Sequence, residues 1–223
     1  MKKIISILML ISSLLIANSF EESKKELAKI YDDLGSSYLY DFYCEAPFKS
    51  NKKGKYIKFE IIPSDKYTPR NEYTKKGKIN QRAKRIEWEH IMPAQNFGKH
   101  LPCWKEGGRK ACKNNPIFAK MESDKQNLVP AIGEINGDRS NFRYSEAPLN
   151  LKYTQYGNCK VYTDFKTKRF YPADYSKGWI ARSYLYMSKT YNIRLSDQER
   201  KLMEAWDKKY PMSEKEKRIR ALF

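Results

Sequence analysis

The sequence contains only two histidines, and one of them, His90, directly follows a glutamate. The ordinary pKa of histidine lets it take up a proton near neutral pH, so it is a natural general base for hydrolysis. The carboxylate just before it, Glu89, can supply an oxygen ligand for a metal ion beside that base. The stretch 85–90 therefore predicts a hydrolytic site, with a surface strand of mixed charge as the alternative. His100, beside Lys99, is the weaker candidate.

A second cluster, Gly107-Gly108-Arg109-Lys110, has the residue types of a phosphate site. Glycines allow a ligand to approach the backbone closely. The guanidinium of Arg109 offers a planar fork of donors that suits a phosphate group. An ordinary basic turn is the alternative interpretation.

A third cluster spans residues 133–141 and alternates carboxylate and amide side chains with two glycines. Mg²⁺ needs few protein oxygen ligands, because it keeps several of its waters. One glutamate and one asparagine, such as Asn136, would therefore be enough to bind it. The alternative is a polar turn, since Asn-Gly-Asp is typical turn sequence.

The elements that must position these clusters are mostly helices. Ser23 and Glu26 form a capping-box pattern, which predicts a helix over 24–34. Further helices are predicted over 117–128 and, in short or irregular form, within 131–141. Amphipathic spacing and a Ser196 cap predict two more, over about 180–191 and 197–210. Strands are expected over 55–62 and around 161–165. The stretch 63–85 is expected to be a long surface segment, 98–115 a loop, and the residues from Ser213 a frayed tail. The expected fold is a helix-rich, mixed α+β single domain.

The charge is strongly basic, with 44 Lys and Arg against 26 Asp and Glu, which gives a net charge of +18. Such an excess favours a polyanionic partner: nucleic acid, anionic lipid or acidic polysaccharide. A mean hydropathy of -0.81 excludes a polytopic membrane protein.

The N-terminus predicts export. Lys2 and Lys3 precede an apolar run over 4–16 and the small residues Ala17 and Ser19, which is the pattern of a secretory signal peptide over 1–19. A retained anchor is the alternative, although the run is short for a bilayer. The rest, 20–223, is expected to form one domain without membrane insertion.

Four cysteines allow three pairings, and disulfides are expected in an exported protein. The short Cys103–Cys112 loop is the favoured pair, which leaves Cys44 with Cys159. A zinc site is the competing interpretation, but no C-x-x-C spacing supports it.

Taken together, the stretches 85–90, 103–112 and 128–142 resemble the bacterial endonuclease I family, and 181–188 and 202–206 resemble its C-terminal helices. The resemblance implies a periplasmic or secreted nuclease without sequence specificity. It implies a ββα-metal (His-Me finger) site and hydrolysis of DNA, and of RNA, that depends on Mg²⁺ and leaves 5′-phosphates. Mn²⁺ or Ca²⁺ would be the substitutes, and we expect a monomer.

The resemblance also assigns roles to single residues. His90 matches the general base, Glu89 and Asn136 match the metal ligands, Arg109 matches the phosphate-binding arginine, and Glu122 matches an acidic residue near the site. Backbone phosphates are expected to be bound by Arg82, Lys84, Arg85, Lys110 and Arg139.

Two other functions account for the same composition. A non-catalytic exported protein that binds nucleic acid explains the charge and the signal peptide. It does not explain why Glu89-His90, Arg109 and Asn136 occur together. An enzyme acting on acidic cell-wall polymers is the second, but no pair of carboxylates stands out for that chemistry.

Overall fold

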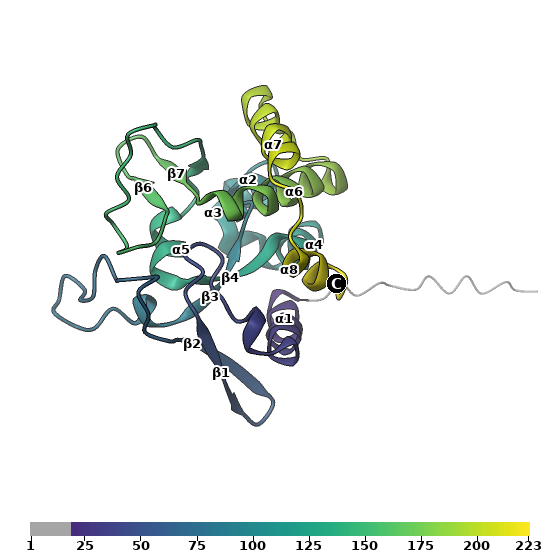
Figure 1. Ribbon diagram of the computed structural model, residues 1–223. Helices are drawn as coiled ribbons and strands as arrows, with labels where there is room; N and C mark the ends of the chain where they lie inside the picture. Colours follow the sequence, from purple (N-terminus) through teal and green to yellow (C-terminus); the bar gives the residue numbers. More distant parts are fainter. Residues whose placement is uncertain (1–18) are drawn as a thin grey trace, which may run out of the picture.

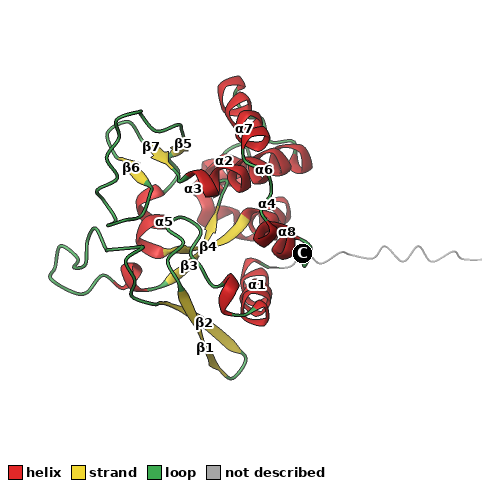
Figure 2. Cartoon of the chain, viewed as in Figure 1, coloured by secondary structure: helices red, strands yellow, loops and turns green. Residues whose placement is uncertain are grey.

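The computed structural model describes residues 19–223. Two short strands, β3 (Ile86–His90) and β4 (Leu128–Ile132), lie at the centre of the molecule, between helices and two further small sheets (Figures 1 and 2). The mixed α+β class is therefore confirmed. The expected signal peptide lies outside the described residues except for Ser19. No helix among residues 19–223 has the length and apolar character needed to cross a bilayer.

Helix α1 (Phe20–Leu34) begins four residues earlier than the sequence predicts. Its N-cap is Ser19, which forms a capping box with Glu22. The expected cap, Ser23, is instead buried and donates to the Ser123 carbonyl oxygen at 2.7 Å. Both serines precede a glutamate by three residues, so the local pattern fits either register. Cleavage after Ser19, as expected from the sequence, would remove this N-cap.

Strand β2 (Tyr56–Ile61) confirms the predicted strand, and it pairs with β1 (Phe48–Lys53), which the sequence did not predict. Five of the six residues of β1 lie at the surface or only half-buried, so β1 lacks an alternating apolar pattern. Gly54 closes the hairpin at a φ of 60°.

β3 and β4 are antiparallel, with Glu89 opposite Val129 and His90 opposite Leu128. Helix α5 (Gly133–Arg139) follows β4 directly, which confirms a short helix within 131–141. The prediction of one helix over 117–128 was wrong beyond its first half. Helix α4 (Pro116–Glu122) ends before a 3₁₀ turn at Lys125–Asn127, and the chain then enters β4.

The segment between β3 and β4 also contains α2 (Ala94–Gly98) and α3 (Pro102–Ala111). Helix α3 lies inside the stretch 98–115, where the sequence predicted a loop, so that prediction was wrong. Helix α3 is kinked at Gly107 and Gly108, and Gly108 has a φ of 64°. The two glycines therefore interrupt the helix, but the residues on either side of them are helical.

The C-terminal part forms a three-stranded sheet and three helices. Its strands are β5 (Arg143–Tyr144), β6 (Tyr162–Asp164) and β7 (Arg169–Tyr171), in the order β5-β7-β6. Helices α6 (Asp174–Tyr191) and α7 (Asp197–Lys209) confirm the two predicted helices, and Ser196 caps α7. The tail is not frayed: it forms α8 (Glu214–Arg220), because Arg182 and Arg220 bind the buried Glu216.

The loop 39–47 covers the outer edge of β4, where a further strand would otherwise pair. The Phe42 N–H donates to the Pro130 carbonyl oxygen at 2.9 Å, and the Ile132 N–H donates to the Asp41 carboxylate at 2.8 Å. The Cys44–Cys159 disulfide ties this loop to the C-terminal half. The second disulfide joins Cys103 and Cys112, so both predicted pairs are confirmed.

Candidate active site

A pocket of about 350 Å³, here called the His90 pocket, lies where β3, α1, α3 and α5 meet. It brings together four of the five candidate catalytic and metal-binding residues, while Glu122 contacts two of them from outside the lining. The lining residues are Phe20, Arg82, Glu87, Trp88, Glu89, His90, Pro93, Ala94, Gln95, Arg109, Asn136, Arg139, Ser140 and Asn141. His100 is exposed and is absent from this lining.

His90 is buried, and its Nε2 lies 2.8 Å from the main-chain oxygen of Glu122. A carbonyl oxygen can only accept a hydrogen bond, so Nε2 carries the proton and Nδ1 keeps its lone pair. Burial lowers the pKa of His90 to about 3. The nearby positive charges of Arg109 and Arg139 also lower this pKa, whereas the hydrogen bond to Glu122 raises it. His90 is therefore neutral at physiological pH, as a general base must be.

Glu122 joins His90 to Arg109. Its main-chain oxygen accepts from His90, while its carboxylate accepts from Arg109 Nε at 2.6 Å. Arg109 is half-exposed, and the Cys103–Cys112 disulfide closes the segment in which it lies. Glu122 thus fixes the orientation of the imidazole through its backbone and that of the guanidinium through its side chain.

Glu89 is 3 % exposed and accepts two hydrogen bonds, both on Oε1. Tyr43 donates from its hydroxyl at 2.8 Å, and Arg139 donates from Nη1 at 3.0 Å. Among residues 19–223, Oε2 has no hydrogen-bond partner. Burial raises the pKa of Glu89 to about 7, although Arg139 and the Tyr43 hydroxyl lower it.

Asn136 is oriented by Glu87, which lies on the same face of β3 as Glu89 because side chains alternate along a strand. Asn136 Nδ2 donates to Glu87 Oε2 at 3.3 Å, and the carboxylate can only accept, so the amide oxygen Oδ1 is free to face elsewhere. Two glycines let α5 approach β3 this closely. A Cβ on Gly133 would lie 2.8 Å from the Glu87 carboxylate, and one on Gly137 would meet the Arg82 guanidinium.

The oxygens left free, Glu89 Oε2 and Asn136 Oδ1, fit one hard divalent cation. Carboxylate and amide oxygens are its preferred ligands, and Mg²⁺ takes few of them from protein. A cation would also favour the ionised form of Glu89, which burial disfavours. The described part of the chain has no group of three or more His, Cys, Asp or Glu side chains that could hold a metal. All four cysteines are in disulfides, so none has a free thiol for the cysteine zinc site that was the alternative.

The five basic residues expected to bind phosphates differ in how free they are. Lys84 and Lys110 are exposed. Arg82 and Arg85 both bind the Glu87 carboxylate, at 2.5 and 2.6 Å.

Arg139 is 1 % exposed, and its guanidinium donates to Glu89 Oε1 and to the carbonyl oxygens of His90 and Ile91. These contacts give Arg139 a structural role at the end of β3. It also donates to the Ser140 carbonyl oxygen at 3.4 Å, so to reach a phosphate it would have to leave these four acceptors.

Sequence reasoning missed several side chains of the site. The Phe20 ring lies 4.9 Å from the His90 ring, centroid to centroid, and the Arg109 guanidinium lies 5.4 Å from the Phe20 centroid. Tyr43 binds Glu89, while Gln95 and Asn141 line the pocket. The only local signal was the position of Tyr43 beside Cys44, because a disulfide fixes its neighbours. Phe20 lies 70 positions before His90 and had no such signal.

Comparisons with known proteins agree over nearly the whole chain. The family model described as Endonuclease I matches residues 19–221. The chain is 45% identical over 194 residues to an extracellular deoxyribonuclease of Aeromonas hydrophila, covering 86% of this chain and 77% of that protein. It is 46% identical over 196 residues to a periplasmic deoxyribonuclease of the same species, covering 87% and 76%. It is 52% identical over 136 residues to Endonuclease-1 of Buchnera aphidicola subsp. Acyrthosiphon pisum, covering 61% and 54%.

Proposed function

The chain belongs to the endonuclease I family and is an exported nuclease, and from this premise we propose that it cleaves DNA, and RNA, at the His90 pocket with one divalent cation. The family match confirms the resemblance seen in the sequence. The observation that supports the proposal most is the meeting of His90, Glu89, Asn136 and Arg109 in one pocket, although three separate elements supply them.

In the proposed reaction, His90 acts as the general base. Its neutral imidazole takes a proton at Nδ1 from a water aimed at the scissile phosphorus. The water oxygen bonds to phosphorus as the bond from phosphorus to the 3′-oxygen breaks, and the 3′-oxygen takes up a proton from solvent, which leaves a 5′-phosphate. The Glu122 carbonyl holds the ring by Nε2, at 2.8 Å, and stabilises the charged imidazolium that forms. The negative charge of a bound phosphate would raise the pKa of His90, against the burial that lowers it.

Glu89 and Asn136 would hold the cation, and β3, β4 and α5 would form the ββα-metal unit. A bound divalent cation offsets the negative charge that develops on the phosphate and the leaving oxygen. We propose Mg²⁺, with Mn²⁺ or Ca²⁺ as substitutes. Tyr43 and Arg139 keep the Glu89 carboxylate in place through Oε1.

Arg109 would contact the scissile phosphate, and Lys84 and Lys110 would contact phosphates further along the backbone. Such contacts carry no sequence information. Arg82 and Arg85 are paired with Glu87, so their contribution would be smaller. Cleavage with little sequence preference follows from this arrangement.

Plasmid DNA incubated with the purified protein tests the proposal. Nicking and fragmentation should occur with Mg²⁺ and stop with EDTA. His90→Ala should abolish cleavage, while the variant still binds DNA in a filter or gel-shift assay. His100→Ala is the matched control and should retain activity. Undiminished cleavage by His90→Ala would remove His90 as the base. Binding without any cleavage by the unmodified protein would favour the non-catalytic alternative.

A further inference from the structure

Two arginines lie side by side on one face of the β5-β7-β6 sheet, outside the His90 pocket. Arg143 of β5 and Arg169 of β7 are register partners in the parallel pair β5–β7, so their side chains leave the same face of the sheet. Their neighbours in the two strands, Tyr144 and Phe170, point to the other face and are buried. Like charges at neighbouring positions repel, which makes this pairing unfavourable unless an anion lies between them.

No carboxylate among the described residues lies within ion-pair distance of either guanidinium. The one recorded side-chain contact is from Arg169 Nη1 to the Ser145 hydroxyl, at 3.1 Å. Two carboxylates lie nearby. Glu146 already binds Lys177 at 2.7 Å, and burial raises the pKa of Glu199, against the opposing effect of Arg143.

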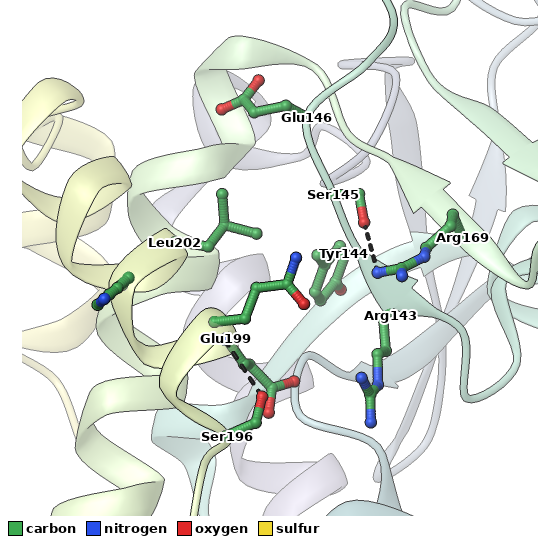
Figure 3. A pocket seen from close by; sticks show the side chains of 10 residues that line it. Arg143, Tyr144, Ser145, Glu146, Arg169, Ser196, Glu199 and Leu202 are labelled. Atoms are coloured by element: carbon green, nitrogen blue, oxygen red, sulfur yellow. Dashed lines mark hydrogen bonds between the residues drawn. The ribbon is translucent and has the colours of Figure 1, made fainter.

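The two arginines line a cavity of about 400 Å³, here called the arginine pocket. Figure 3 shows Arg143 and Arg169 on one side of it, and Ser196 and Glu199 from the start of α7 on the other. The exposed Lys201 adds a third positive charge to the lining.

A smaller pocket of about 180 Å³ lies between this pocket and the His90 pocket. The small pocket shares Gln95 and Asn141 with the His90 pocket, and it shares Arg143 and Glu199 with the arginine pocket. Lys99 also lines it. A chain of cavities therefore leads from the general base to the arginine pair.

We propose that the arginine pocket is a second phosphate subsite, which binds a backbone phosphate of the same strand that is cut at His90. The inference rests on the proposed function, because it takes the strand in the His90 pocket as its starting point. A phosphodiester fits better than a carboxylate ligand would, since two adjacent guanidinium groups match the several oxygens of a phosphate. Phosphates repeat along a strand, so a strand cut at His90 can present a second phosphate to a nearby pocket.

The test compares Arg143→Gln and Arg169→Gln on a long and a short substrate. A strand of about 30 nucleotides can present phosphates to both pockets, whereas a dinucleotide has a single phosphate and can fill only one phosphate site. Each substitution should raise KM for the long strand about tenfold, as expected for loss of a charged hydrogen bond, and should leave kcat unchanged. KM for the dinucleotide should not change. The dependence of log KM on log salt should flatten by about 0.7 for each lost phosphate contact.

Arg218→Gln is the control, because Arg218 is an exposed arginine on α8, outside all three pockets. It should leave both KM values unchanged. An unchanged KM for the long strand in both arginine variants would overturn the subsite, and so would an equal loss on both substrates. If the unmodified protein cuts neither substrate, the proposed function fails. The subsite is then tested separately, because a labelled strand in EDTA should still bind about tenfold more weakly to each arginine variant.

Discussion

Replacing Arg139 with methionine should destabilise the protein by an amount that grows with pH. Arg139 and Glu89 form a buried ion pair, with side-chain exposures of 1% and 4%. Arg139→Met removes the cation and leaves Glu89 buried beside Tyr43. Breaking a buried pair from one side costs about 3–5 kcal/mol, because the remaining charge has no partner.

The pH dependence follows from Glu89. Burial already raises its pKa to about 7, and loss of Arg139, which lowers that pKa, should raise it further. The folded variant then holds a proton that the unfolded chain has released, so stability falls as pH rises towards the folded pKa. Near pH 6 Glu89 is neutral, and the remaining loss of about 1–3 kcal/mol comes from the unsatisfied carbonyls of His90 and Ile91. Near pH 9 the full loss of about 3–5 kcal/mol should appear.

Urea unfolding followed by tryptophan fluorescence measures this, in EDTA and with the disulfides intact. Arg82→Met is the matched control, since Arg82 pairs with Glu87 at a side-chain exposure of 43% and should cost at most about 1 kcal/mol at either pH. A loss for Arg139→Met that is below 1 kcal/mol, or that is the same at both pH values, would refute the role given to the buried pair.

Three further outcomes are expected. The acid limb of the pH profile of activity should move to lower pH as the Mg²⁺ concentration rises, because metal and proton compete for Glu89, whose pKa is about 7. An acid limb whose pH position does not change with Mg²⁺ concentration would contradict this. Tyr43→Phe should weaken Mg²⁺ activation about tenfold, since loss of a charged hydrogen bond frees Glu89, and metal titrations of cleavage would measure it. Phe20→Ala should lower kcat more than Phe20→Leu, because the Phe20 side chain packs against His90 at 4.9 Å. A kcat for Phe20→Ala equal to that of the unmodified protein would indicate that this packing is not needed.

The sequence predicted which residues meet in the His90 pocket better than it predicted the elements around them. Glu89, His90 and Asn136 could be picked out because a carboxylate, an imidazole and an amide suit metal-assisted hydrolysis. Glu89 and His90 are also adjacent in the sequence, which suggests directly that they act together. The contacts that orient them come from far along the chain: Tyr43 lies 46 positions from Glu89, and Arg139 lies 50 positions from it. No local periodicity encodes such contacts.

Errors in the elements also have tertiary causes. β4 contains Pro130, which argues against a strand, yet loop 39–47 covers the outer edge of β4 and makes the proline acceptable. The charged tail predicts a solvated end of the chain. It folds as α8 because Arg182 of α6 and Arg220 surround Glu216, which is 2% exposed.

The central claim is that one divalent cation binds Glu89 and Asn136 beside His90, and crystals soaked in Mn²⁺ test it most directly. The account predicts one anomalous peak about 2.1 Å from an oxygen of each ligand, in the same pocket as His90. The peak should be lost in Glu89→Gln crystals and should remain in His90→Ala crystals. A peak elsewhere, or one that persists without the Glu89 carboxylate, would contradict the account.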